Sequence, residues 1–125
     1  MRPITILPLF LAILPFHGNA EDQSGAAVYA AVCSECHASG KDDAPVFGDA
    51  KRWRKLVREG LDDLVPAALR GIRKMPAMGG NPALSDLEVA RAVVHMANAG
   101  GGKFTEPSAA DARRWRKKAD AARKG

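Results

Sequence analysis

The feature that constrains this chain most is the run Cys33-Ser34-Glu35-Cys36-His37, which places two thiols directly before an imidazole. Two thiols three positions apart at the end of a helix can each add to one of the two vinyl groups of a haem. The adjacent imidazole is then held against the iron. The run therefore predicts one covalently bound haem c, attached through Cys33 and Cys36, with His37 as an axial ligand of the iron.

Three other interpretations of a close cysteine pair compete with haem. A disulfide is the default in an exported protein, but the histidine that follows directly changes the argument. A redox dithiol is typical of a strand-helix-strand unit, and this sequence has no strand pattern. A zinc site needs more ligands than the pair and His37 provide. After residue 20 only His95 remains and no further cysteine, so the pattern favours haem.

The first twenty residues have the pattern of an export signal. Arg2 provides a positive start, and residues 4–16 are nearly all apolar. Gly18 and Ala20 place small residues three before and one before a cut, as signal peptidase prefers. The apolar run is short of the roughly 20 residues that a spanning helix needs. We expect cleavage after Ala20 and a protein that is periplasmic or otherwise exported.

A first helix is predicted to lead into the cysteine pair. Ser24 can cap this helix, and its apolar residues lie at helical spacing. The predicted buried face is formed by Val28, Ala31 and Val32.

Further helices follow, all of them short. Asp49 can cap one that ends at Gly60. The next contains Pro66, which is tolerated only in a first turn, where amides have no intrahelical partner. Ser85 and Glu88 form the capping box of another, whose apolar stripe is typical of a buried helix. The fold class predicted is all-α, with about four to five short helices.

Four side chains are candidates for the sixth ligand of the iron. Met96 lies on the apolar stripe of its helix and is expected in the core, whereas His95 lies off that stripe and is expected to be solvated. Met75 and Met78 lie in residues 75–82, a stretch rich in Gly and Pro that is predicted to stay irregular. Spacing alone does not choose between these two methionines.

The last eighteen residues are strongly basic. The chain has a net charge of +5, and residues 108–125 hold seven bases and two acids. Ser108 and Asp111 could begin a helix, but Trp115 is the only large apolar residue, so we expect an appendage that is helical only part of the time. Through Arg113–Lys124 it could concentrate the protein near an acidic partner or anionic lipid. Nucleic acid is not an expected partner of an exported protein.

Residues 24–107 resemble a class I cytochrome c, closest to the cytochrome c5 subgroup of bacteria. The matching pieces are residues 25–29, 33–40, 44–45, 48–49, 53, 60–62, 75–86 and 90–98. The resemblance implies the class I cytochrome c fold, wrapped around one haem. It divides the chain into a signal peptide (residues 1–20), a cytochrome c domain (residues 21–107) and a basic C-terminal extension (residues 108–125).

The resemblance also implies roles for individual residues. In such proteins the axial methionine precedes a proline, which makes Met75 the second ligand. The carbonyl of Pro45 would accept a hydrogen bond from His37 and orient it. Met78 stands where a lysine is common, and His95 stands where an aromatic is usual.

These residues predict an electron carrier and not an enzyme, because both axial positions of the iron are filled by protein. Redox proteins would meet an exposed haem edge, which Arg70, Arg73 and Lys74 could surround. Two alternatives remain: a haem enzyme or gas sensor in which Met75 is labile, and a subunit whose basic extension docks onto a larger oxidoreductase.

Overall fold

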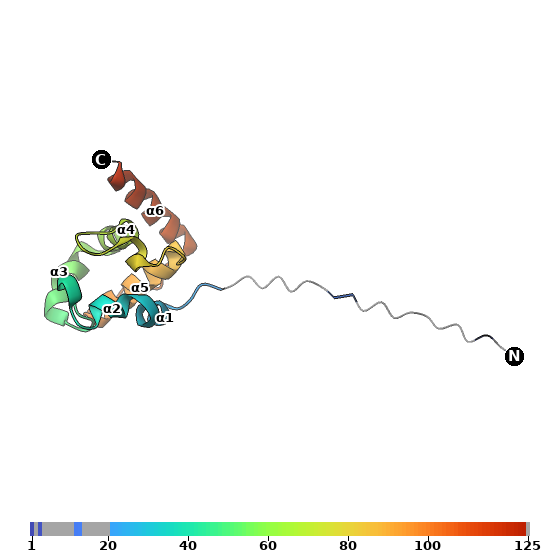
Figure 1. Ribbon diagram of the computed structural model, residues 1–125. Helices are drawn as coiled ribbons and strands as arrows, with labels where there is room; N and C mark the ends of the chain where they lie inside the picture. Colours follow the sequence, from blue (N-terminus) through green and yellow to red (C-terminus); the bar gives the residue numbers. More distant parts are fainter. Residues whose placement is uncertain (2, 4–11, 14–20, 125) are drawn as a thin grey trace.

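The computed structural model describes residues 1, 3, 12–13 and 21–124, and the regular secondary structure of this part of the chain is helical (Figure 1). The predicted signal peptide and its cut after Ala20 lie almost entirely outside the described residues. Within them, the only pairing of strand type is an isolated bridge between Ile72 and Met75. None of the described helices is long and apolar enough to cross a bilayer. The predicted all-α fold is confirmed.

The N-terminal helix consists of α1 (Gly25–Val28), a π-helical turn η1 (Tyr29–Cys33) and α2 (Ser34–His37). Ser24 caps it as predicted, since its hydroxyl oxygen accepts a hydrogen bond from the Ala27 amide at 3.1 Å. A π turn inserts an extra residue and so rotates the side chains that follow it. Ala31 is therefore exposed, and its predicted place beside the buried Val28 is wrong.

α5 (Asp86–Ala99) is the central helix of the fold, and α1 packs directly against it. A Cβ atom on Gly25 would lie 2.2 Å from the Arg91 carbonyl oxygen, so this approach requires glycine. The predicted capping box is present: the Ser85 hydroxyl accepts from the Glu88 amide at 3.0 Å, and the Glu88 carboxylate accepts from the Ser85 amide at 2.9 Å. This second bond holds the pKa of Glu88 below its usual range.

α3 (Ala50–Glu59) and α4 (Leu61–Arg70) are separated by Gly60, which has a φ of 84°. Asp49 caps α3 as predicted, but α4 begins earlier than expected. Pro66 is its sixth residue and lies in the second turn, so the predicted first-turn position is wrong. Because proline has no amide hydrogen, the carbonyl of Asp62 has no partner within the helix. Lys118 donates to that oxygen instead, at 2.7 Å.

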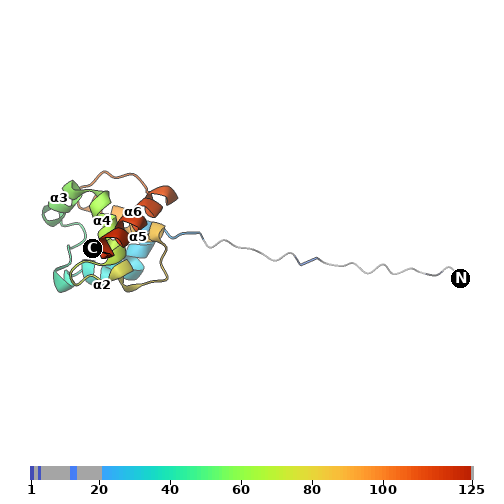
Figure 2. The same cartoon turned by 90° about the horizontal axis from the view of Figure 1, so that it is seen from above.

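The basic extension forms a full helix, α6 (Ala109–Arg123), which lies beside α4 (Figures 1 and 2). Ser108 and Asp111 form a capping box at its start. Its buried stripe consists of Ala112, Trp115 and Ala119, and Trp115 is only 3% exposed. The expectation of a partly helical appendage without a stripe is wrong, because two alanines at helical spacing complete the apolar face around one tryptophan.

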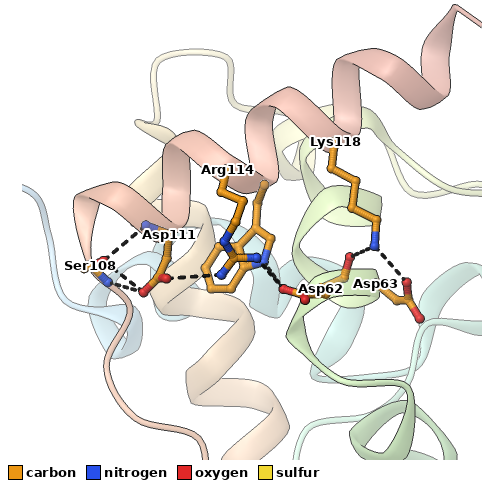
Figure 3. A network of polar contacts seen from close by, with 7 residues as sticks. Asp62, Asp63, Ser108, Asp111, Arg114 and Lys118 are labelled. Carbon is orange, nitrogen blue, oxygen red and sulfur yellow. Dashed lines mark hydrogen bonds and ion pairs between the residues drawn. The ribbon is translucent and has the colours of Figure 1, made fainter.

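Polar contacts at Asp62 and Asp63 tie α6 to the start of α4 (Figure 3). One carboxylate oxygen of Asp62 accepts from Arg114 and from the indole nitrogen of Trp115, both at 2.7 Å. The Trp115 and Arg114 hydrogen bonds lower the pKa of Asp62. Lys118, which donates to the Asp62 carbonyl, also lies 3.3 Å from the Asp63 carboxylate. α6 is therefore held by a buried indole and by a polar anchor on α4.

Trp115→Ala should destabilise the protein by about 3–5 kcal/mol, as a buried aromatic truncation does. Deleting residues 108–125 should lower the free energy of unfolding at least as much. Guanidinium denaturation followed by circular dichroism measures both. Arg113→Ala is the control, because Arg113 is an exposed neighbour on the same helix. If the truncated protein unfolded at the midpoint of the full chain, α6 would contribute nothing to the fold.

Candidate haem site

A cavity of about 1450 Å³ opens between the N-terminal helix, α3, α4 and the irregular segment of residues 72–80, here called the methionine loop. Its apolar wall is formed by Val32, Leu56, Leu64, Ala68 and Val93. Cys33, Cys36, His37 and Met75 all line this same space. The fold thus brings together four predicted site residues from two segments that lie far apart in the sequence.

Both thiols are half-buried and free at the cavity wall. Cys33 packs against the apolar core, and this burial raises the pKa of its thiol. Cys36 lies one position before His37 at the end of α2. The motif is therefore presented by a helix whose preceding π turn sets the direction of its side chains.

His37 is 9% exposed, and its ring is held by a backbone carbonyl. The distance from Nδ1 to the Pro45 carbonyl oxygen is 2.8 Å, which is the contact that the resemblance implied. A carbonyl oxygen can only accept, so Nδ1 carries the proton in this bond. The other ring nitrogen, Nε2, is then the free electron-pair donor available to a metal.

The loop that provides Pro45 is fixed at two further points. The Phe47 amide donates to the His37 carbonyl at 2.7 Å, and the indole nitrogen of Trp53 donates to the Val46 carbonyl at 3.0 Å. Trp53 is buried, and Gly100 packs so closely on it that an added Cβ would lie 2.3 Å away. The C-terminal end of α5 thereby fixes Trp53, which in turn holds the loop whose Pro45 carbonyl binds His37.

The structure places the two loop methionines differently. Met75 pairs with Ile72 through two backbone hydrogen bonds, of 2.9 and 3.1 Å, and lines the large cavity. Met78 is not among the residues that line it. The Met78 sulfur instead accepts a contact of 3.3 Å from a guanidinium nitrogen of Arg116. Spacing left these methionines as equal candidates, whereas their surroundings are unequal.

The remaining candidates occupy the positions of packing residues. Met96 is buried in the core as expected. His95 is half-buried against Tyr29 and Phe47, with ring centroids 5.7 and 5.2 Å apart, so the expected solvated position is wrong. The histidine fills the place of an aromatic ring between the N-terminal helix and the loop before α3.

The rim of the cavity is mixed in charge. Arg70, Arg73 and Lys74 line it, as the sequence suggested. Acids accompany them: Lys74 lies 3.9 Å from Asp42, and Arg52 lies 3.1 Å from Asp43. The rim therefore combines both signs and is not a purely basic ring.

This donor set fits a covalent haem. Two free thiols lie beside an imidazole whose Nδ1 is already bonded and whose Nε2 remains available. The thioethers of Met75 and Met96 border the same cavity, whose lining combines apolar side chains with the charged residues of the rim. Histidine and methionine are the axial pair typical of electron-carrying cytochromes c.

Comparisons with known proteins agree with this geometry. Residues 20–96 match the family described as cytochrome c oxidase, cbb3-type, subunit III. Cytochrome c-555 of Chlorobaculum tepidum is 37% identical over 68% of this chain and 85% of its own length. Cytochrome c5 of Azotobacter vinelandii is also 37% identical, over 59% of this chain and 92% of its own.

A solved structure is similar as well. It is the crystal structure of an electron transfer complex of nitrite reductase with cytochrome c. The matched chain is 35% identical, with a TM-score of 0.60, covering 63% of this chain and 96% of that chain. The protein belongs to the class I c-type cytochromes. The relatives named above are monohaem electron carriers, and proteins of this family carry one covalently attached haem c.

Sequence reasoning missed two contributors to the site. The hydrogen bond from Trp53 to Val46 gave no local signal, because it joins a helix to a loop without a motif. The contact of Arg116 with Met78 spans 38 positions in the sequence. The alanine spacing around Trp115 was the one signal that could have placed α6, and hence Arg116, on the fold.

Proposed function

We propose that this protein is an exported, periplasmic electron carrier, in which Cys33 and Cys36 attach the haem and His37 and Met75 ligate its iron. The observation that supports this most is that all four side chains border one apolar cavity. In this proposal residues 1–20 are an export signal cleaved after Ala20. Residues 21–107 carry the haem, and residues 108–125 extend that domain with a packed helix.

When bound, the haem supplies an iron that takes up and releases a single electron. The chain's own part is to fix the ligands and exclude water. The Pro45 carbonyl orients the His37 ring and strengthens it as a donor. The soft thioether of Met75 would favour the ferrous state. His37 and Met75 would together hold the iron and leave it no open position for a substrate, which supports a carrier rather than an enzyme.

The partners proposed are redox proteins that approach the rim of the cavity. The similar solved structure is an electron transfer complex of nitrite reductase with cytochrome c. Charges at the rim, including Arg70, Arg73 and Lys74, would steer such an encounter, and their effect would fall with salt. No nucleic-acid partner is proposed.

The outer face of α6 is proposed as a second contact surface, for an acidic partner protein. Arg114, Arg116 and Lys118 pair with acids of the protein itself. The exposed bases that remain on the helix and its end are Arg113, Lys117, Arg123 and Lys124. This face favours the second candidate function, a carrier subunit docked to a larger oxidoreductase. Anionic lipid is the other surface that such bases would bind.

Substitution of the two loop methionines tests the proposed ligation. Met75→Ala should give a high-spin iron that binds carbon monoxide, because one axial position opens. Met78→Ala should leave the visible spectrum and a single one-electron titration nearly unchanged. Redox titration and ferrous spectra with carbon monoxide measure both. The reverse pattern would assign the ligand to Met78, and rapid carbon monoxide binding by the unchanged protein would favour the sensor.

Charge reversal tests the proposed surface of α6. Arg113→Glu with Lys117→Glu should slow electron transfer to the physiological oxidoreductase at low salt and much less at high salt. Arg54→Glu with Arg58→Glu is the matched control, with the same charge change and spacing on the exposed side of α3. Equal slowing by both pairs would remove the special role of α6. Loss of binding to anionic vesicles alone would assign the face to lipid.

A further inference from the structure

Met78 lies in a backbone conformation that needs support. Its φ is 60°, in the left-handed region, and Gly79 and Gly80 that follow have φ values of 65° and 88°. A residue with a Cβ atom is disfavoured there and persists where its surroundings fix it. The Met78 side chain packs against the buried core, and contacts of this kind help to hold the loop in that conformation.

Arg116 of α6 provides such a contact. Its guanidinium grips Asp86 at the start of α5 through two hydrogen bonds, of 3.0 Å from Nε and 2.7 Å from Nη2. Nη1 lies 3.3 Å from Asp120, and Nη2 is also 3.3 Å from the Met78 sulfur. The Arg116 side chain is 29% exposed, so most of it is buried. A two-pronged ion pair of this kind fixes the orientation of the guanidinium plane.

The position of Arg116 does not depend on Met78. The adjacent Trp115 is buried in the core, and its indole donates to Asp62 on α4. The family match ends at residue 96, before α6 begins. The arginine thus belongs to a helix that lies outside the matched region and is anchored on other elements.

We propose that Arg116 is a positioning residue that keeps the Met78 thioether away from the haem iron. This rests on the proposed ligation by Met75. Two thioethers three positions apart in one loop would otherwise compete for the same axial position. The Met78 sulfur accepts a contact from an Arg116 N–H donor, and Met78 is not among the residues that line the large cavity, whereas Met75 is. Both methionines border a small pocket beside Cys33, so Met78 lies close enough to the site for its direction to matter. α6 thereby selects one of two chemically equal ligands.

The test is a rescue experiment on the haem-loaded protein. Met75→Ala alone should stay high-spin, because Arg116 holds Met78. Adding Arg116→Leu should release Met78 and restore a low-spin fraction, with carbon monoxide binding about tenfold slower, in line with a lost hydrogen bond to a charged group. Adding Met78→Leu as a third change should abolish this recovery. The readouts are the visible spectrum and the kinetics of carbon monoxide binding.

Two controls keep the result interpretable. Arg114→Leu in the Met75→Ala protein removes another ion pair of α6 and should restore nothing, because Arg114 contacts Asp62 and Asp111. Arg116→Lys keeps the charge but cannot form the two hydrogen bonds to Asp86, and it replaces Arg116→Leu if that variant unfolds. In the Met75→Ala protein it should restore part of the low-spin fraction. A Met75→Ala, Arg116→Leu protein as open as Met75→Ala alone would overturn the proposal. So would a Met75→Ala protein that is already low-spin through Met78. Haem extraction from each variant is also measured. If the haem stays on the polypeptide in every variant, either of these results counts against the role of Arg116 and not against the covalent haem.

Discussion

The hydrogen bond between His37 Nδ1 and the Pro45 carbonyl is the interaction on which the site depends. At 2.8 Å it fixes which ring nitrogen is free. The chain after α2 must return to make this bond, and the Phe47 amide and the Trp53 indole hold the returning loop. α3 and the end of α5 then follow from the burial of Trp53 against Gly100. The returning loop, Trp53 of α3 and the end of α5 therefore act together to fix the orientation of the His37 imidazole.

A second group of elements, α4 and α6, supports the methionine loop. α4 ends just before this loop, and α6 packs along α4. Pro66 has a direct part in that packing, because the carbonyl it leaves free on Asp62 accepts from Lys118. A residue that weakens one helix thus provides an anchor for another. The basic composition of α6 suggests a solvated surface helix, but three of its bases form ion pairs with acids of the protein itself.

Local chemistry made much of this structure predictable. Cys33, Cys36 and His37 are adjacent in sequence, so their shared cavity follows from one short run. The capping residues Ser24, Asp49 and Ser85 each accept from the amide three positions further on, and all three predictions hold. The errors arose where the backbone departs from a regular helix without a sequence motif, and where distant packing decides. A π turn moved Ala31 to the surface, an early helix start placed Pro66 in a second turn, and α4 gave Trp115 a core to enter.

Every role proposed for this site depends on one haem attached covalently through Cys33 and Cys36. Acid–acetone extraction of the denatured, exported protein tests it most directly, combined with the intact mass of the polypeptide. The colour should stay with the polypeptide. The mass should equal that of residues 21–125 plus one haem, and thiol reagents should find no free cysteine. Colour that extracts into the acetone, or two reactive thiols on a polypeptide without haem, would contradict it.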